Sequence, residues 1–189
     1  MIKQKKLRMT IICAFFVAIT AILAQMEIPL PLVPISGQTL AVGLTATILG
    51  RKYGAITMIG YAAIGSMGVP VFAQAKGGLG VLLGPTGGYI FAFIVAAYVT
   101  GLILEKTSFT LMYAMIANTV AMIIILLLGT IQLKFIVDLS WKEAMISGVY
   151  PFIIVGLIKA FLASWLGITI RRRLIQARLL QRTMGTIQS

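Results

Sequence analysis

A single lysine, Lys159, interrupts an apolar stretch of the sequence that runs from Gly148 to Ile170 and carries no other charge. At the centre of a bilayer a lysine costs about 3 kcal/mol on insertion scales, so it is expected to face a bundle interior, an aqueous cavity or an anionic partner. Its side chain cannot reach water at the distant Arg171, because a helix rises about 1.5 Å per residue. Lys159 is therefore a candidate ligand-binding residue, and the alternative is a purely structural lysine.

The remaining inventory of reactive side chains argues against an enzyme. The chain has no histidine, and its only four acidic residues, all at the ends of apolar runs, are Glu27, Glu105, Asp138 and Glu143. Paired carboxylates, a metal cluster or a Ser-His-Asp triad cannot be assembled from this set. A pair of Lys159 with Ser36, Ser66 or Ser147 is formally available, but no spacing favours it. We expect no catalytic residue, no metal site and no cofactor.

Composition places the chain in the membrane. Of its 189 residues, 60% are hydrophobic and 11% are charged, and the mean hydropathy is +1.04. A helical span needs about 20 apolar residues, so the length allows five to seven helices. Cys13 is the only cysteine, which excludes a disulfide within one chain. The sequence predicts an all-α integral membrane protein with one membrane-embedded domain over residues 1–189.

The distribution of lysine and arginine along the chain indicates how it crosses the membrane. A net charge of +12 could suggest nucleic-acid binding, but the basic residues lie at span ends rather than on a soluble basic face. Cytoplasmic loops retain lysine and arginine, so with six helices both termini are predicted to be cytoplasmic. The outer ends then hold Lys76, Lys134 and Lys142, and the inner ends hold Lys3, Lys5, Lys6, Arg8, Arg51, Lys52, Lys106, Arg171, Arg172, Arg173, Arg178 and Arg182.

Six apolar runs predict the helices. The first covers about Leu7 to Ala24 and ends at the proline loop (Met26 to Gly37), because proline lacks an amide donor. Two short runs are too short for a comfortable perpendicular crossing, which implies tilt or enclosure by protein. They cover Gln38 to Gly50 and Gly54 to Gly68; the later helices cover about Pro85 to Leu104, Phe109 to Phe135, and Gly148 into the arginine-rich tail.

A glycine-rich segment (Gly68 to Tyr89) lies between the third and fourth helices. Irregular backbone at membrane depth is tolerated only where protein encloses it or where it lines a cavity. The predicted topology places this segment, the proline loop and the start of the last helix on the outer face. We therefore expect an external pocket with a cationic floor at Lys159.

The sequence has no motif for ATP hydrolysis or proton relay that could drive transport. It has no GxxxxGK[ST] phosphate loop and no carboxylate in the middle of a predicted span. Two classes remain: a solute-binding subunit that takes its energy from partner chains, and a passive facilitator. Nanomolar solute binding would favour the subunit, because conduction needs weak binding.

Two ordered motifs give the chain a family resemblance. PISGQTLAVGLTATILGRKYGAI and IGSMGVPVFAQAKGGLGVLLGPTGGYIFAF, the latter with GPTGGY at Gly84 to Tyr89, resemble the biotin-specific S components of energy-coupling-factor (ECF) transporters, the BioY family. The resemblance covers nearly the whole chain, including LIKA around Lys159. It implies a six-helix, multi-pass subunit of the bacterial cell membrane that binds biotin from outside. Its partners would be membrane lipid, a transmembrane coupling subunit and two cytoplasmic ATPases, with no nucleic acid. A relative for another small vitamin is the alternative within this architecture.

The resemblance also implies a substrate-binding set. Lys159 supplies a cation, the GPTGGY backbone and Tyr89 line the cavity, Lys76 is the polar position before helix four, and Gln38 opens helix two. Tyr89 and Phe72 could instead be aromatic anchors at the membrane interface, and Gln38 could serve its helix terminus. The implied set is Lys159, Lys76, Tyr89, Thr86, Gly84, Gly87, Gly88, Gln38, Gln74, Phe72 and Asn118.

The resemblance also implies a partner interface on the first helix. In the family, a small-xxx-small stripe on this helix meets the coupling subunit. Ala14 and Ala18 match that stripe, and small residues let membrane helices approach closely.

The family often has D-x-x-K on helix six, whereas this chain has Gly156 three residues before Lys159. An acceptor is thus missing. Either Asn118 or Gln74 replaces it, or the ligand is held differently, or its affinity is lower.

Overall fold

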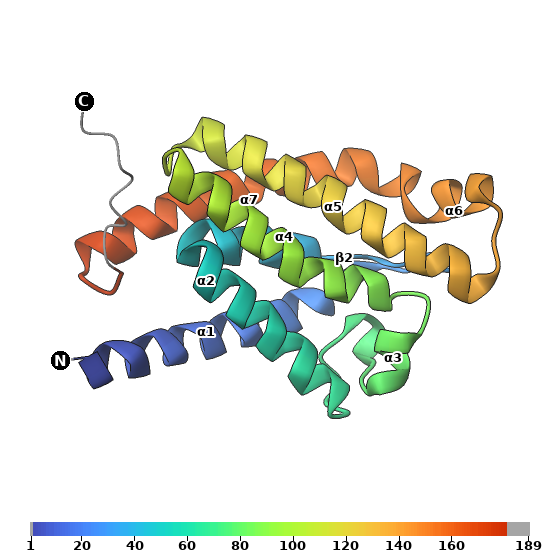
Figure 1. Ribbon diagram of the computed structural model, residues 1–189, viewed down its shortest axis with the longest axis horizontal. Coiled ribbons are helices and arrows are strands. Elements are labelled where there is room, and N and C mark those ends of the chain that lie inside the picture. The colour runs from blue at the N-terminus through green and yellow to red at the C-terminus, as the bar shows by residue number, and fades with distance from the viewer. Residues whose placement is uncertain (1, 181–189) are drawn as a thin grey trace.

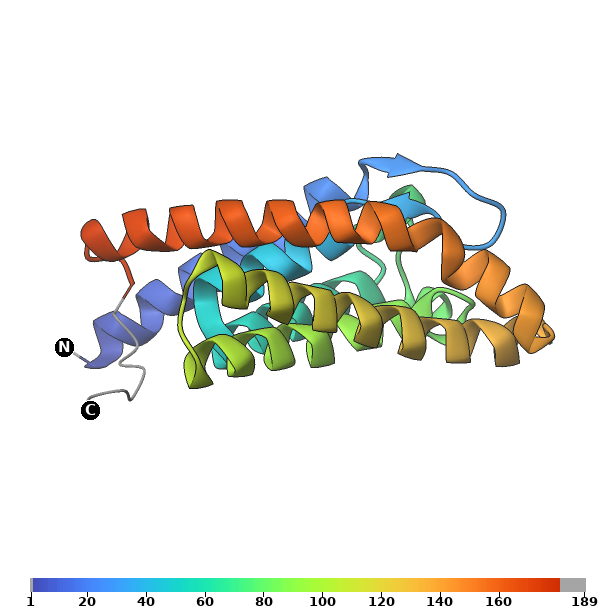
Figure 2. The same ribbon diagram turned by 90° about the horizontal axis from the view of Figure 1, so that it is seen from above.

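The computed structural model describes residues 2–180 as a long bundle of helices (Figures 1 and 2). Arg182, one of the predicted inner arginines, lies outside these residues. The elements are α1 (Ile2–Ala24), β1 (Glu27–Ile28), β2 (Ile35–Ser36), α2 (Gln38–Ser66), the 3-10 turn η1 (Ala73–Ala75), α3 (Leu79–Leu83), α4 (Gly87–Lys106), α5 (Leu111–Val137), α6 (Trp141–Gly148) and α7 (Tyr150–Gln176).

The ends of the described chain and the covering loops lie at opposite ends of the bundle. The start of α1 and the end of α7 lie at one end, whereas the β1–β2 loop, α3 and α6 lie at the other (Figures 1 and 2). Four stretches in the described residues are long and apolar enough to cross a membrane: Lys6–Ala24, Gly87–Lys106, Leu111–Val137 and Trp141–Gln176. The prediction of an all-helical membrane fold is confirmed at this level.

Helix α2 consists of two limbs that meet at Gly50. This residue has a φ of 78° and a ψ of −177°, a backbone conformation that glycine adopts without a Cβ penalty. The limbs, 38–50 and 51–66, match the two short runs in the sequence. Glu105 of α4 fixes the turn, because its carboxylate accepts the Arg51 amide at 2.9 Å and pairs with the Arg51 guanidinium at 3.0 Å.

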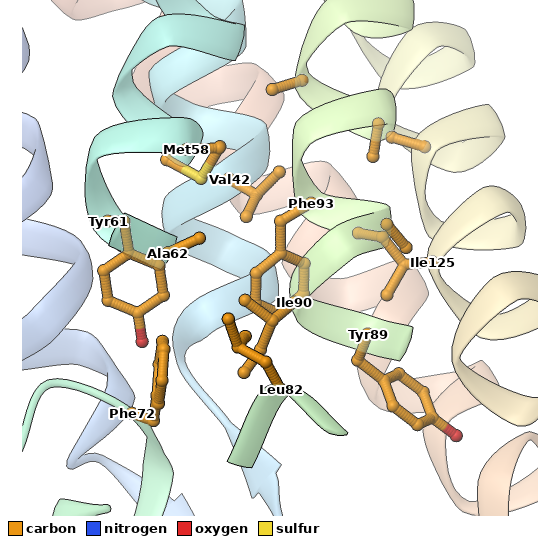
Figure 3. Packing of buried hydrophobic residues seen from close by; sticks show 14 of the residues in the cluster. Val42, Met58, Tyr61, Ala62, Phe72, Leu82, Tyr89, Ile90, Phe93 and Ile125 are labelled. Carbon is orange, nitrogen blue, oxygen red and sulfur yellow. The ribbon is translucent and has the colours of Figure 1, made fainter. Parts of the chain in front are cut away.

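Small residues allow the central helices to pack closely. Ala92, Ala96 and Ala97 of α4 are fully buried, as are Ala114 and Ala117 of α5. Lipid tails are as apolar as leucine, so close backbone packing, not hydrophobic burial from water, holds helices together inside a membrane. The resulting core of α2, α4 and α5 surrounds Phe93 and Ile90 (Figure 3).

The first limb of α2 and helix α7 are tied at the end opposite the β1–β2 loop. Arg171 is 5% exposed, donates to the carbonyl of Ile48 and lies 3.6 Å from the centre of the Phe109 ring. The carbonyls at the end of a helix lack intrahelical donors. Arg171 therefore caps the first limb just before the chain turns at Gly50.

Some boundaries differ from those predicted. Helix α1 begins at Ile2, before Leu7, and the predicted irregular segment contains η1, α3 and the start of α4. The proline loop contains a two-residue antiparallel pair, and α6 lies between the last two predicted helices, where no helix was predicted. A capping box explains α6, because Ser140 accepts the Glu143 amide while the Glu143 carboxylate accepts the Ser140 amide.

The close approach of α4 to the Gly50 turn predicts a stability effect. A Cβ at Gly101 would meet the Arg51 backbone, whereas a Cβ at Gly80 meets nothing within 4 Å. Because backbone cannot move aside like a flexible side chain, Gly101→Ala should destabilise the protein by about 1–3 kcal/mol. Thermal unfolding in detergent should show a lower Tm for Gly101→Ala and little change for Gly80→Ala; equal Tm values would contradict this packing.

Candidate ligand-binding site

A pocket opens between the first limb of α2 and helices α4, α5 and α7, beneath the proline loop and the glycine-rich segment. Eight of the predicted site residues line it: Gln38, Phe72, Gln74, Lys76, Thr86, Tyr89, Asn118 and Lys159. Its apolar wall is formed by Val42, Val81, Ile90, Phe93, Ala121, Met122, Ile125, Leu126, Phe152 and Val155. A few polar groups in a mostly apolar cavity are typical of a small-molecule site.

The ammonium of Lys159 lies inside this pocket. Its Nζ donates to the backbone carbonyl of Ser36 at 2.7 Å, and the residue is partly buried. The Ser36 hydroxyl is used elsewhere, since it donates to Gln38. No carboxylate in residues 2–180 forms an ion pair with Lys159. An ammonium has three donors, so two remain for a ligand that could also supply the missing negative charge.

Asn118 joins three helices at the pocket wall. It is 4% exposed, and its Nδ2 lies 3.0 Å from Thr47 Oγ1 of α2, 3.0 Å from Ser164 Oγ of α7 and 3.0 Å from its own helix at the Ala114 carbonyl. Its Oδ1 has no hydrogen-bond partner among the described residues and lies beside Gly43, where a Cβ would meet it. Asn118 can thus offer an acceptor to a ligand.

Two loops cover the pocket and are joined to each other. Gln25 donates to the Phe72 carbonyl at 3.0 Å and accepts the Ala75 amide at 3.0 Å. Glu27 accepts the Gln74 amide at 3.1 Å. Both ties hold the η1 turn, in which Gln74 and Ala75 have positive φ values of 62° and 50°. The proline loop and the glycine-rich segment therefore form one connected cover.

Two aromatic side chains reach the pocket from inside the protein. Phe72 is 1% exposed and packs edge-on against Tyr61 with centroids 5.4 Å apart. Tyr89 is 7% exposed, and its hydroxyl donates to the Gly148 carbonyl at 3.0 Å. Both rings are enclosed by the protein, whereas an anchor at the membrane interface would present its ring to lipid.

The three predicted glycines, Gly84, Gly87 and Gly88, are not among the pocket-lining residues. A Cβ at Gly87 would strike the Leu82 carbonyl, and one at Gly88 would lie 2.6 Å from the Gln132 Cβ. Gln132 also donates to the carbonyls of Leu82 and Gly84, at 2.9 and 2.8 Å. Gly87 and Gly88 thus let α4 begin close to α5, whereas a Cβ at Gly84 would meet the Gly80 carbonyl of α3.

Three residues that matter to the site were not in the predicted binding set, although Ser36 was named as a formal catalytic partner of Lys159. Ser36 supplies the acceptor for Lys159, Tyr61 holds Gln38, and Met122 fills the space beside Gly156. Ser36 lies in the proline loop two residues before Gln38, which was a usable signal. Met122 lies one turn after the predicted Asn118 on the same helix, and both line the pocket. Residues four apart share a helix face, so Asn118 was a usable signal for Met122.

The fold and the site define a multi-pass membrane protein with a small-molecule pocket near one end of its bundle. The chain belongs to the BioY family, whose model matches residues 1–176, and the family resemblance seen in the sequence is thereby confirmed. It is 36% identical to the biotin transporter BioY2 of Lactococcus lactis over 172 residues, 91% of this chain and 94% of that protein.

Two further relatives agree. The biotin transporter BioY of Thermotoga maritima is 40% identical over 167 residues, 88% of this chain and 97% of that protein. Among solved structures, the S-component for biotin from an ECF-type ABC transporter superposes with a TM-score of 0.82 at 28% identity, covering 91% of this chain and 95% of that one. The likeness extends over sequence and fold together.

Proposed function

We propose that this chain is the substrate-binding S component of an ECF-type vitamin transporter and that it captures biotin from outside the cell membrane. One observation carries the proposal: the Lys159 ammonium lies in a pocket covered by two joined loops and forms no ion pair with any carboxylate in residues 2–180. Two relatives named as biotin transporters support the choice of ligand. The family consists of transporter subunits and not of enzymes.

The polar groups of the pocket suit the two ends of biotin. Its carboxylate would compensate the Lys159 ammonium, because a buried cation is most stable beside an opposite charge. Its ureido group has N–H donors, for which Asn118 Oδ1 is an unused acceptor, and its fused rings need the apolar wall around Phe93 and Ile125. Asn118 would thus take the place of the acid that is missing at Gly156.

The membrane topology follows from the bundle and the charges. The two limbs of α2 would complete six crossings together with α1, α4, α5 and α7. Since α1 starts and α7 ends at the same end of the bundle, the positive residues concentrated there support a topology in which both termini would lie in the cytoplasm. The pocket then opens outward, as capture from outside requires.

Import would depend on partner chains. The proposed partners are a transmembrane coupling subunit and two cytoplasmic ATPases, which supply the free energy that this chain has no motif to provide. Ala14 and Ala18 are exposed on α1 while Cys13, Phe16 and Val17 face inward. The exposed stripe of small residues would let a partner helix approach closely.

Replacing the buried cation tests the ligand. Lys159→Met keeps the length of the side chain but removes its charge, and losing one partner of a buried charge pair costs about 2–5 kcal/mol. Purified protein in detergent should therefore bind labelled biotin at least about thirtyfold more weakly than wild type. Lys142→Met, an exposed lysine outside the pocket, is the control.

The same measurement separates the alternatives. Tight biotin binding by wild type together with unchanged binding by Lys159→Met would contradict the assigned role of Lys159. A wild-type protein that binds another vitamin but not biotin would redirect the proposal to that vitamin. A protein that conducts solute without tight binding of any would point to a facilitator.

Restoring an acid near the cation tests how the pocket manages without one. A Cβ at Gly156 would meet only Met122 Sδ and Cγ, the flexible end of a methionine that can move aside. Gly156→Asp should therefore leave biotin affinity unchanged or increase it, as measured by equilibrium binding. Gly156→Asn is the uncharged control of equal shape. A large loss confined to Gly156→Asp would mean that the new carboxylate displaces the ligand from Lys159.

The α1 stripe predicts a defect in assembly that spares ligand binding. Leucines at Ala14 and Ala18 would hold a partner helix away, because membrane helices associate through close packing. The double variant should bind biotin like wild type but lose most of the coupling subunit in co-purification from membranes. Ala63→Leu, an exposed alanine on α2, is the control. Full recovery of the complex by the double variant would exclude this face.

A further inference from the structure

We propose that Tyr61, which does not line the pocket, is a positioning residue that orders both covering loops and Gln38 for ligand binding. The inference rests on the proposed function for its ligand, but its structural basis is a hydrogen-bond chain that exists without one. The chain begins in the glycine-rich segment and ends at the Lys159 ammonium, and it joins residues from three separate parts of the sequence.

Each link in this chain has an identified donor and acceptor. The Tyr61 hydroxyl donates to the Val71 carbonyl at 2.8 Å and accepts from Gln38 Nε2 at 2.6 Å. Gln38 Oε1 in turn accepts the Ser36 hydroxyl at 2.8 Å. The Ser36 carbonyl accepts Lys159 Nζ at 2.7 Å. Tyr61 thus connects the loop that carries Phe72 with the loop that touches Lys159.

The two contacts to Gln38 fix which atom it can offer to a ligand. A carboxamide has one acceptor oxygen and two N–H donors, and either end can point either way. Here Ser36 takes the oxygen and Tyr61 takes one N–H, so the remaining N–H is available to a ligand oxygen. Without the Tyr61 hydroxyl the amide could turn over, and an oxygen would then face the same ligand atom.

Burial makes this arrangement costly to disturb. Tyr61 is 0% exposed and Gln38 is 7% exposed. Removing the hydroxyl leaves the Gln38 amide and the Val71 carbonyl without their partner in a site with little water, where an unmade hydrogen bond is expensive. The Tyr61 ring also packs against Phe72 (Figure 3), and this contact would survive a change to phenylalanine.

A neighbouring threonine provides a matched control. Thr57 lies one turn before Tyr61 on the same limb and is 0% exposed. Its hydroxyl donates a hydrogen bond to the Tyr53 carbonyl at 2.7 Å. It does not line the pocket, and its hydroxyl bonds to its own helix and not to either loop. Thr57→Val therefore removes a buried hydroxyl from the same helix without touching the chain between the loops.

The experiment compares Tyr61→Phe with Thr57→Val in purified protein. Tyr61→Phe should weaken equilibrium biotin binding about tenfold, the value of one hydrogen bond with its buried partners left unpaired, whereas Thr57→Val should match wild type. In the background of Gln38→Ala the Tyr61→Phe effect should almost vanish, because the two residues act through one contact. Equal affinity of Tyr61→Phe and wild type, or full additivity with Gln38→Ala, would overturn the proposal.

Hydrogen exchange without biotin gives an independent readout. The amides of residues 69–78 and 35–38 should exchange faster in Tyr61→Phe than in Thr57→Val, while the α4 and α5 amides stay equally protected. Unchanged loop exchange, or faster exchange throughout both variants, would overturn the positioning role. Failure of wild-type protein to bind biotin would reject the proposed ligand, and this readout would still decide the role of Tyr61.

Discussion

The structure is organised around one partly buried ammonium, that of Lys159, which has no counter-charge within residues 2–180. Lys159 lies within a membrane-spanning helix, where an isolated cation is costly. Among the described residues, its ammonium has a hydrogen bond only to the Ser36 carbonyl. A carbonyl satisfies one donor but carries no net charge. The site is therefore left with two donors and one positive charge to be compensated by something that enters from outside.

The surrounding fold keeps that charge away from lipid and within reach of a solute. The first limb of α2 runs beside α7, held by Lys159 at the loop end and by Arg171 at the other. Asn118 bonds to both helices between these points. Gln25 and Glu27 join the two covering loops above. The hydrogen bonds between helices and loops thus lie around the ligand site, while close packing of small residues holds the rest of the bundle together.

Much of this could be predicted from the sequence because charges and helix breakers are unambiguous in an apolar chain. Lys159, the proline loop and the two short limbs on either side of Gly50 were all visible in this way. The capping box of α6 was also visible, as Ser140 and Glu143, but was not used. Tyr61 could not be predicted, because the sequence does not show which side of the second limb of α2 faces protein and which faces lipid. Met122 lies one turn after Asn118 and could have been placed at the pocket with it. The glycines of GPTGGY were assigned to the pocket but are not among its lining residues, and Gly87 and Gly88 lie where α4 packs closely against α3 and α5.

The most direct test of this account is an experimental structure of the protein with bound biotin. The account predicts a biotin carboxylate oxygen within about 2.7–2.9 Å of Lys159 Nζ, the distance of a charge-assisted hydrogen bond, beneath the closed proline loop and glycine-rich segment. A carboxylate held elsewhere, with Lys159 still bonded only to Ser36 or turned toward lipid, would contradict it.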